Sequence, residues 1–168
     1  MLERIYIDLD GVIANFDKGI KLLGNFHSEE EIEQMWKLIA KWGVGFWESL
    51  EKTPWADRLI SQLRLFNIPL YFLSSPGNLQ KHPDSVPYAS CGKMLWVHKY
   101  YPDIELILAR SKHLLAKKGT YLIDDTRDKV DSFAALGGYT HFWNIRDYTP
   151  DVNIVTLTTY INALNFKL

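Results

Sequence analysis

Short apolar runs recur along the chain, separated by segments whose apolar residues follow helical spacing. Apolar runs of this length are typical of buried strands. We predict five strands, at 4–9, 68–73, 104–109, 121–123 and 140–143. The long segment between the first two strands has a different pattern and is treated separately below.

Helical patterns separate the later strands. Leu59, Ile60, Leu63 and Phe66, for example, fall on one face of a helix. We predict crossover helices at 56–66, 94–101 and 128–136, the last of which ends at Gly137-Gly138. Strands that alternate with helices are typical of α/β folds with a mostly parallel sheet, in which ligands bind outside the carboxyl ends of the strands.

The segment 15–55 departs from this alternation, because it has helical patterns at 16–23 and 29–42 but no convincing strand. We therefore predict a single domain, 1–168, with a helical cap inserted at about 15–55. The aromatic residues of the segment are Phe16, Phe26, Trp36, Trp42, Phe46, Trp47 and Trp55. Such rings usually form the core of a helical subdomain, whereas a lid over an active site would use some of them to stack on a ligand.

The composition fits one globular domain, with 47% hydrophobic and 14% aromatic residues in a chain of 168. The net charge of −1 provides no basic field, so we expect neither extended nucleic-acid binding nor attraction to a membrane surface. No apolar run approaches the ~18 residues of a membrane span, and none resembles a signal peptide. The single cysteine, Cys91, excludes an intrachain disulfide, and together these features predict a cytoplasmic protein.

Two carboxylates follow the first predicted strand, in the sequence Asp8-Leu9-Asp10-Gly11. Residues two apart in a strand point to the same side, so these like charges lie close together. Each raises the proton affinity of the other, and the pair therefore either shares a proton or binds a cation. The alternative is a surface turn in which Asp10-Gly11 only reverses the chain.

Polar clusters also follow the next strands. Ser74 and Ser75 offer hydroxyls and backbone amides that can hold a phosphate, although Ser-Ser-Pro-Gly is also an ordinary turn. Lys112 supplies an ammonium that can neutralise phosphate charge, with Lys117 and Lys118 as nearby alternatives.

Adjacent carboxylates, Asp124 and Asp125, end the run 121–123. Capping of the following helix would explain one of these acidic residues, but not both. The five histidines show no metal-ligand spacing, and neither standard glycine-rich nucleotide loop occurs. An Asp-x-Asp motif, a hydroxyl, a lysine and an Asp-Asp motif thus follow successive apolar runs.

This order of motifs resembles the haloacid dehalogenase-like hydrolase superfamily, over roughly residues 4–143. Several stretches are similar to the 5'(3')-deoxyribonucleotidase family in particular. They are Asp8–Phe16, Phe46–Leu50 with Pro54, Leu73–Pro76, Lys93-x-x-Trp96-Val97-x-Lys99-Tyr100 and Leu122–Asp125. The resemblance implies a Rossmann-like three-layer core, and a small helical cap inserted after the first strand.

The resemblance also implies a phosphatase mechanism. Asp8 would attack phosphorus to give an aspartyl-phosphate, and Asp10 would protonate the leaving group and then activate water. Mg²⁺ would be held by Asp8, the Asp10 backbone carbonyl and Asp124, with Asp125 in or next to the coordination shell. Oxygen ligands without histidine or cysteine favour Mg²⁺ over Zn²⁺.

The phosphate-binding residues implied by the family are Ser74, Ser75 and Lys112, together with backbone amides near Gly11. Phe16 occupies the family's position for an aromatic residue that faces the base, and Trp47 or Phe46 lies near a second such position. Either ring could equally pack the interior of the cap.

Three functions agree with these features. The first is a Mg²⁺-dependent phosphatase of nucleoside monophosphates, with deoxyribonucleotides as the expected substrates and a small-molecule nucleotide as the partner. The second keeps the chemistry but acts on a sugar phosphate or a nucleic-acid 3'-phosphate. The third is a non-catalytic phosphate- or metal-binding module. The sequence leaves open whether the protein forms a homodimer.

Overall fold

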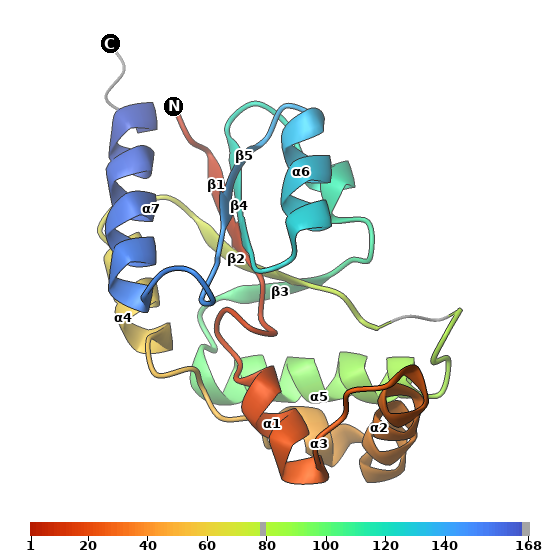
Figure 1. The fold of residues 1–168 in the computed structure, drawn as a ribbon. Helices are drawn as coiled ribbons and strands as arrows, with labels where there is room; N and C mark the ends of the chain where they lie inside the picture. Colours follow the sequence, from red (N-terminus) through yellow and green to blue (C-terminus); the bar gives the residue numbers. More distant parts are fainter. Residues whose placement is uncertain (78–79, 166–168) are drawn as a thin grey trace.

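The described part of the chain, residues 1–77 and 80–165 of a computed structural model, contains one five-stranded sheet (Figure 1). Its strands are β1 (Arg4–Ile7), β2 (Leu70–Ser74), β3 (Glu105–Leu108), β4 (Thr120–Asp124) and β5 (Tyr139–Phe142). The order is β3-β2-β1-β4-β5, and every pairing between these strands is parallel. The predicted α/β class with a mostly parallel sheet is therefore confirmed.

The central strand, β1, pairs with β2 on one side and β4 on the other. It ends at Ile7, two residues earlier than predicted, because the backbone turns through Gly11, whose φ is +78°. Because these strands are parallel, the carboxyl ends of β1, β2 and β4 lie at the same end of the sheet, and the polar motifs follow them there.

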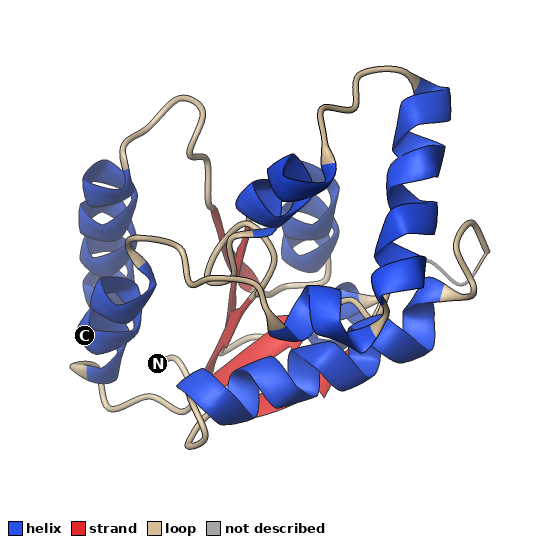
Figure 2. Cartoon of the chain, turned by 90° about the horizontal axis from the view of Figure 1, so that it is seen from below, coloured by secondary structure: helices blue, strands red, loops and turns tan. Residues whose placement is uncertain are grey.

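Helices cover both faces of the sheet (Figures 1 and 2). One side carries α4 (Ala56–Arg64) and α7 (Pro150–Asn165), and the other carries α6 (Arg127–Ala135) and the short 3₁₀ helix η1 (Lys112–Leu115). Helix α7 was not predicted, although its buried Ile154, Leu157 and Ile161 have helical spacing. None of the described helices is long and apolar enough to span a membrane.

Helix α5 (Ser85–Tyr100) is much longer than the predicted segment 94–101. Pro87 lies in its first turn, where a proline costs no backbone hydrogen bond. Its buried face includes Lys93, Trp96 and Val97, whereas Leu95 is 41% exposed. The predicted segment therefore forms the last turns of a helix that begins nine residues earlier.

The inserted segment folds into α1 (Phe16–Leu23), α2 (Glu29–Trp42) and α3 (Val44–Glu48). The first two helices have the predicted bounds because local signals fix their starts: the Asn15 side chain accepts from the Lys18 N–H at 3.1 Å, and Ser28 forms a capping box with Glu31. In Figure 1, all three helices lie with α5 beyond one end of the sheet.

The two ends of the inserted segment lie side by side. Asn15 N–H donates to the Glu51 carbonyl at 2.8 Å, and Thr53 N–H donates to the Ile13 carbonyl at 2.8 Å. Helix α3 also packs closely on α5, because a Cβ at Gly92 would lie 2.4 Å from the Trp47 Cβ. We therefore keep 15–55 as the proposed bounds of a cap, and add that α5 of the core supports it.

Candidate active site

A cavity of about 260 Å³ opens at the carboxyl ends of β1 and β4. The predicted residues that line it are Asp8, Asp10, Phe16, Ser75, Lys112, Asp124 and Asp125. They come from the loop after β1, from α1, from the loop after β2, from η1 and from the end of β4. Tertiary structure thus brings the four separate motifs to one place.

Lys112 is the lysine of this cavity. Its side chain is 2% exposed, and its Nζ lies 2.8 Å from Asp8 Oδ1 and 2.6 Å from Asp124 Oδ2. Burial acts to lower the pKa of Lys112, but the two carboxylates outweigh it and raise the pKa above its usual value. Lys117, the alternative, instead pairs with Glu3 at the amino end of the sheet.

Three carboxylates gather around this ammonium. Oxygens of Asp8, Asp124 and Asp125 all lie within 4.8 Å of one another, an arrangement that could hold a metal ion. Burial and the charge of Asp8 raise the pKa of Asp124 to about 6. Burial, with the charges of Asp8 and Asp124, raises the pKa of Asp125 to about 7. One ammonium cannot neutralise this cluster, and its oxygen donors fit a hard divalent cation.

Asp10 is held by Lys93, a residue of α5 to which the sequence analysis gave no role. Lys93 Nζ donates to Asp10 Oδ2 at 2.6 Å, to Ser74 Oγ at 3.0 Å and to the Ser75 carbonyl at 2.7 Å. The lysine is 3% exposed. Burial raises the pKa of the Asp10 carboxyl, although Lys93 acts in the opposite direction. Asp10 Oδ1 is buried and finds no hydrogen-bond partner among the described residues.

The two predicted serines have different places. Ser75 lines the cavity, and its Oγ accepts from the Gly77 N–H at 3.3 Å. Ser74 is fully buried, is not among the described residues that line the cavity, and bonds Lys93. Direct phosphate binding by Ser74 stays a prediction, and the contact it makes here is with the lysine that holds Asp10.

The two predicted base-facing rings also differ. Phe16 lines the cavity, but Trp47 is 2% exposed and lies behind it. The rings are stacked, with centroids 5.5 Å apart and planes 14° apart, and Lys93 Nζ lies 4.9 Å from the centroid of Trp47. Trp47 therefore packs against Phe16 and Lys93, and its contact with a base stays a prediction.

Lys93 was missed because nothing near it in the sequence marks it as functional. It belongs to a stretch that resembles the nucleotidase family, and that resemblance was the available signal.

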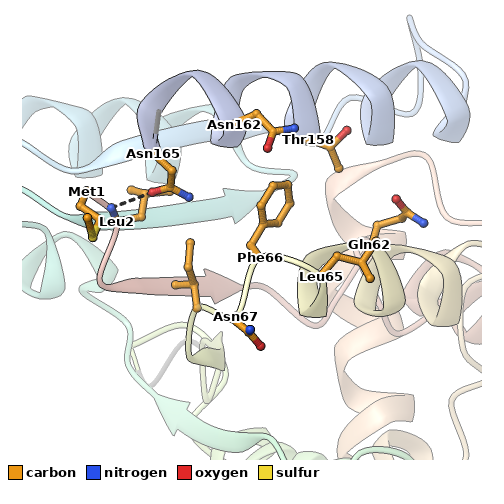
Figure 3. A pocket seen from close by; sticks show the side chains of 10 residues that line it. Met1, Leu2, Gln62, Leu65, Phe66, Asn67, Thr158, Asn162 and Asn165 are labelled. Atoms are coloured by element: carbon orange, nitrogen blue, oxygen red, sulfur yellow. Dashed lines mark hydrogen bonds between the residues drawn. The ribbon is translucent and has the colours of Figure 1, made fainter. Parts of the chain in front are cut away.

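A larger cavity, about 620 Å³, lies near the amino end of β1, between α4 and α7 (Figure 3). Apolar residues and uncharged polar side chains, such as Asn162 and Gln62, line it in the described part, so it offers no comparable chemistry.

No family model matches the chain. Human mitochondrial 5'(3')-deoxyribonucleotidase is 28% identical over 151 residues, and the match covers 74% of this chain and 63% of the relative. The chain thus spans less than two thirds of the length of that relative.

Solved structures with a similar fold are more distant in sequence. A haloacid dehalogenase-like family hydrolase from Xanthomonas campestris aligns with a TM-score of 0.59 and 10% identity, over 97% of this chain and 91% of the other. YfnB of Bacillus subtilis, which is described as a HAD-hydrolase and was solved with magnesium, aligns with a TM-score of 0.56 and 13% identity, over 96% and 99%. The chain therefore has the fold of the haloacid dehalogenase-like hydrolases, as the order of its motifs predicted.

Proposed function

We propose that the protein is a Mg²⁺-dependent phosphatase that hydrolyses nucleoside monophosphates, with deoxyribonucleotides as its substrates, through an aspartyl-phosphate on Asp8. The observation that carries this proposal is the position of Asp8, which is paired with buried Lys112 and lies within the cluster formed with Asp124 and Asp125. The named activity of the human relative supports the choice of substrate.

Asp8 is prepared for attack on phosphorus. Its Oδ1 accepts from the Leu9 N–H at 2.8 Å and pairs with Lys112, so the carboxylate is held in one orientation at the cavity wall. Attack forms a bond between a carboxylate oxygen of Asp8 and phosphorus, and breaks the bond between phosphorus and the ester oxygen of the substrate. Lys112 stays beside Asp8 and offsets the negative charge of the phosphoryl group.

Asp10 is suited to proton transfer. Its raised pKa favours the protonated carboxyl, which can donate to the leaving ester oxygen. The resulting carboxylate then removes a proton from water, which attacks phosphorus, releases phosphate and restores Asp8. Lys93 donates to Asp10 Oδ2 and so holds the carboxyl in one orientation.

Asp8, Asp124, Asp125 and the Asp10 backbone carbonyl would hold the metal. Bound Mg²⁺ supplies the positive charge that lets a phosphate dianion approach these carboxylates and that offsets charge on the phosphoryl oxygens. A cytoplasmic location and a homodimer remain predictions that do not bear on this chemistry.

The test is release of phosphate from 5'- and 3'-deoxyribonucleotides, ribonucleotides, sugar phosphates and 3'-phosphorylated oligonucleotides, with Mg²⁺ or with EDTA. We expect metal-dependent turnover, highest on deoxyribonucleotides, that is lost in Asp8→Asn. The control, Asp131→Asn, removes an exposed carboxylate of α6 outside the cavity and should keep full activity. Turnover confined to sugar phosphates or oligonucleotide ends would support the phosphatase reaction but reject nucleoside monophosphates as the substrates. Absence of turnover on every ester would instead favour a binding module.

A further inference from the structure

A second cavity, of about 320 Å³, adjoins the catalytic one. The two share Asp17, Asp125 and Thr126 in their walls, so a molecule seated at Asp8 can extend from one into the other. Small-molecule sites in proteins typically have volumes of about 300–1,000 Å³, and the combined space reaches that range. Nothing in the proposed phosphatase chemistry requires this second space.

Two arginines line the second cavity, Arg127 at the start of α6 and Arg146 in the loop after β5. Within residues 1–77 and 80–165, neither guanidinium forms an ion pair with a carboxylate. The arginines of α4 differ in this respect, since Arg58 pairs with Asp151 and Arg64 with Asp103. Unpaired guanidiniums in a cavity favour an anionic ligand.

The structure restrains the Arg127 side chain and the backbone at Arg146. The Arg127 guanidinium carbon lies 4.0 Å from the centroid of the Phe142 ring, a cation–π contact at the cavity wall. The loop that carries Arg146 is fixed by Asn144, whose Oδ1 accepts from the Arg146 N–H at 3.0 Å and from the Asp147 N–H at 3.1 Å. A restrained donor such as Arg127 loses less entropy when it binds a ligand than a free side chain does.

The charge of the wall between the cavities fits the same interpretation. Asp125 is a proposed metal ligand, so its negative charge is offset when the site is loaded. Asp17 is then the acidic residue that remains in the described wall, which also carries two guanidiniums. The second cavity therefore has an excess of positive charge beside a pocket that takes a phosphate.

We propose that the second cavity binds a second phosphate group of the substrate, so that the enzyme prefers phosphomonoesters with two phosphates, such as nucleoside 3',5'-bisphosphates, over the corresponding monophosphates. This inference rests on the proposed function, because it places the reacting phosphate at Asp8. Arg127 and Arg146 are thus specificity-determining residues, with Phe142 and Asn144 positioning them.

The test compares kcat/KM for thymidine 5'-monophosphate and thymidine 3',5'-bisphosphate in the Mg²⁺-loaded enzyme. We expect the wild type to prefer the bisphosphate, and Arg127→Gln and Arg146→Gln each to lower its kcat/KM by about tenfold or more, as loss of a charge-assisted hydrogen bond does. Turnover of the monophosphate should stay within about twofold of the wild type. Arg64→Gln, at the far edge of the sheet, removes the same charge and should change neither value.

Equal losses on both substrates, or no loss, would overturn the second subsite while leaving the phosphatase intact. If the wild type hydrolyses neither substrate, the proposed function fails first, and titration calorimetry with thymidine 3',5'-bisphosphate then decides the subsite. Binding that is lost in the Arg127→Gln/Arg146→Gln double variant and kept in Arg64→Gln supports it. Binding that is absent, or that is unaffected by the double variant, refutes it.

Discussion

Lys93 Nζ lies 2.6 Å from Asp10 Oδ2, and this ion pair joins the middle of α5 to the loop that follows β1. The lysine side chain is buried, at 4% exposed, whereas the aspartate side chain faces the cavity and is 27% exposed. Helix α5 packs on α3 of the cap, and this ion pair links α5 to Asp10. A helix that packs on α3 therefore holds Asp10, the proposed acid and base.

Substitution of Lys93 by methionine should lower both activity and stability. Without the ammonium, Asp10 is no longer held in place and its pKa rises further, so we expect kcat to fall by ~10²-fold, within the range for loss of acid–base catalysis. Removal of one member of a fully buried ion pair costs about 3 kcal/mol in the free energy of unfolding, and we expect a smaller loss here because Asp10 is partly exposed. Steady-state kinetics and urea unfolding measure the two effects.

A double variant separates these effects. Lys93→Met combined with Asp10→Asn leaves no unpaired charge, so it should recover part of the lost stability but none of the activity. If the two substitutions instead destabilise the protein additively, the pair contributes little to the fold.

Gly11 and Asp125 are in close contact, because a Cβ at Gly11 would lie 2.0 Å from Asp125 Oδ2. Gly11→Ala should therefore displace a proposed metal ligand and raise the Mg²⁺ concentration needed for half-maximal activity by about tenfold. Gly137→Ala is the matched control: its φ is +89°, similar to the +78° of Gly11, but no atom lies within 4 Å of the added Cβ. Both variants should lose about 1–2 kcal/mol to backbone strain. A similar Mg²⁺ requirement in both would argue against Asp125 as a ligand.

The stabilisation that Mg²⁺ gives should depend on pH. In the metal-free protein the pKa is about 6 for Asp124 and about 7 for Asp125, so both carboxylates are ionised at pH 8 and largely protonated at pH 5.5. Protons then compete with the cation, and the Mg²⁺-induced rise in Tm should be largest at pH 8 and shrink as the pH falls through 7 and 6. Thermal unfolding with Mg²⁺ and with EDTA at each pH measures it.

A second titration must be separated from this one. Burial lowers the pKa of His141, which therefore stays neutral in the fold and destabilises the protein as the pH falls below its unfolded value. That loss is the same with and without Mg²⁺, because His141 lies outside the described lining of the catalytic cavity. Subtraction of the Tm with EDTA from the Tm with Mg²⁺ at the same pH therefore removes the contribution of His141. A Mg²⁺ effect of equal size at pH 8 and pH 5.5 would exclude the carboxylate cluster as the site.

Phe16→Leu should weaken nucleotide binding specifically. Stacking of a base on an aromatic side chain contributes about 1–3 kcal/mol, which corresponds to roughly a 5- to 150-fold loss in kcat/KM. Glycerol 2-phosphate has no base and should be hydrolysed at an unchanged rate. Trp47→Phe keeps an aromatic ring behind Phe16 and should have a smaller effect on nucleotides. Equal losses on both substrates would mean that Phe16 only packs the cap.

Local sequence was sufficient for elements whose signals lie within a few residues. The apolar runs around Ile5 and Leu122 predicted two central strands, and the helical patterns at 16–23 and 29–42 predicted α1 and α2. Apolar periodicity is a property of neighbouring residues, and the caps at Asn15 and Ser28 that begin these helices are also local contacts, so the sequence contains these signals. The order of four polar motifs likewise indicated the fold, because strand ends of a parallel sheet share an edge.

Contacts between distant residues decided the rest. Lys112 and Lys117 are both plausible from the sequence, and only packing buries the first between two carboxylates while the second reaches Glu3. Lys93 joins the site from 83 residues away, and Arg127 and Arg146 come together only because β5 lies beside β4. The sequence determined which chemical groups this protein has and in what order. The tertiary structure decided which of them meet, because burial and the pairing of charges depend on atoms brought together from separate parts of the chain.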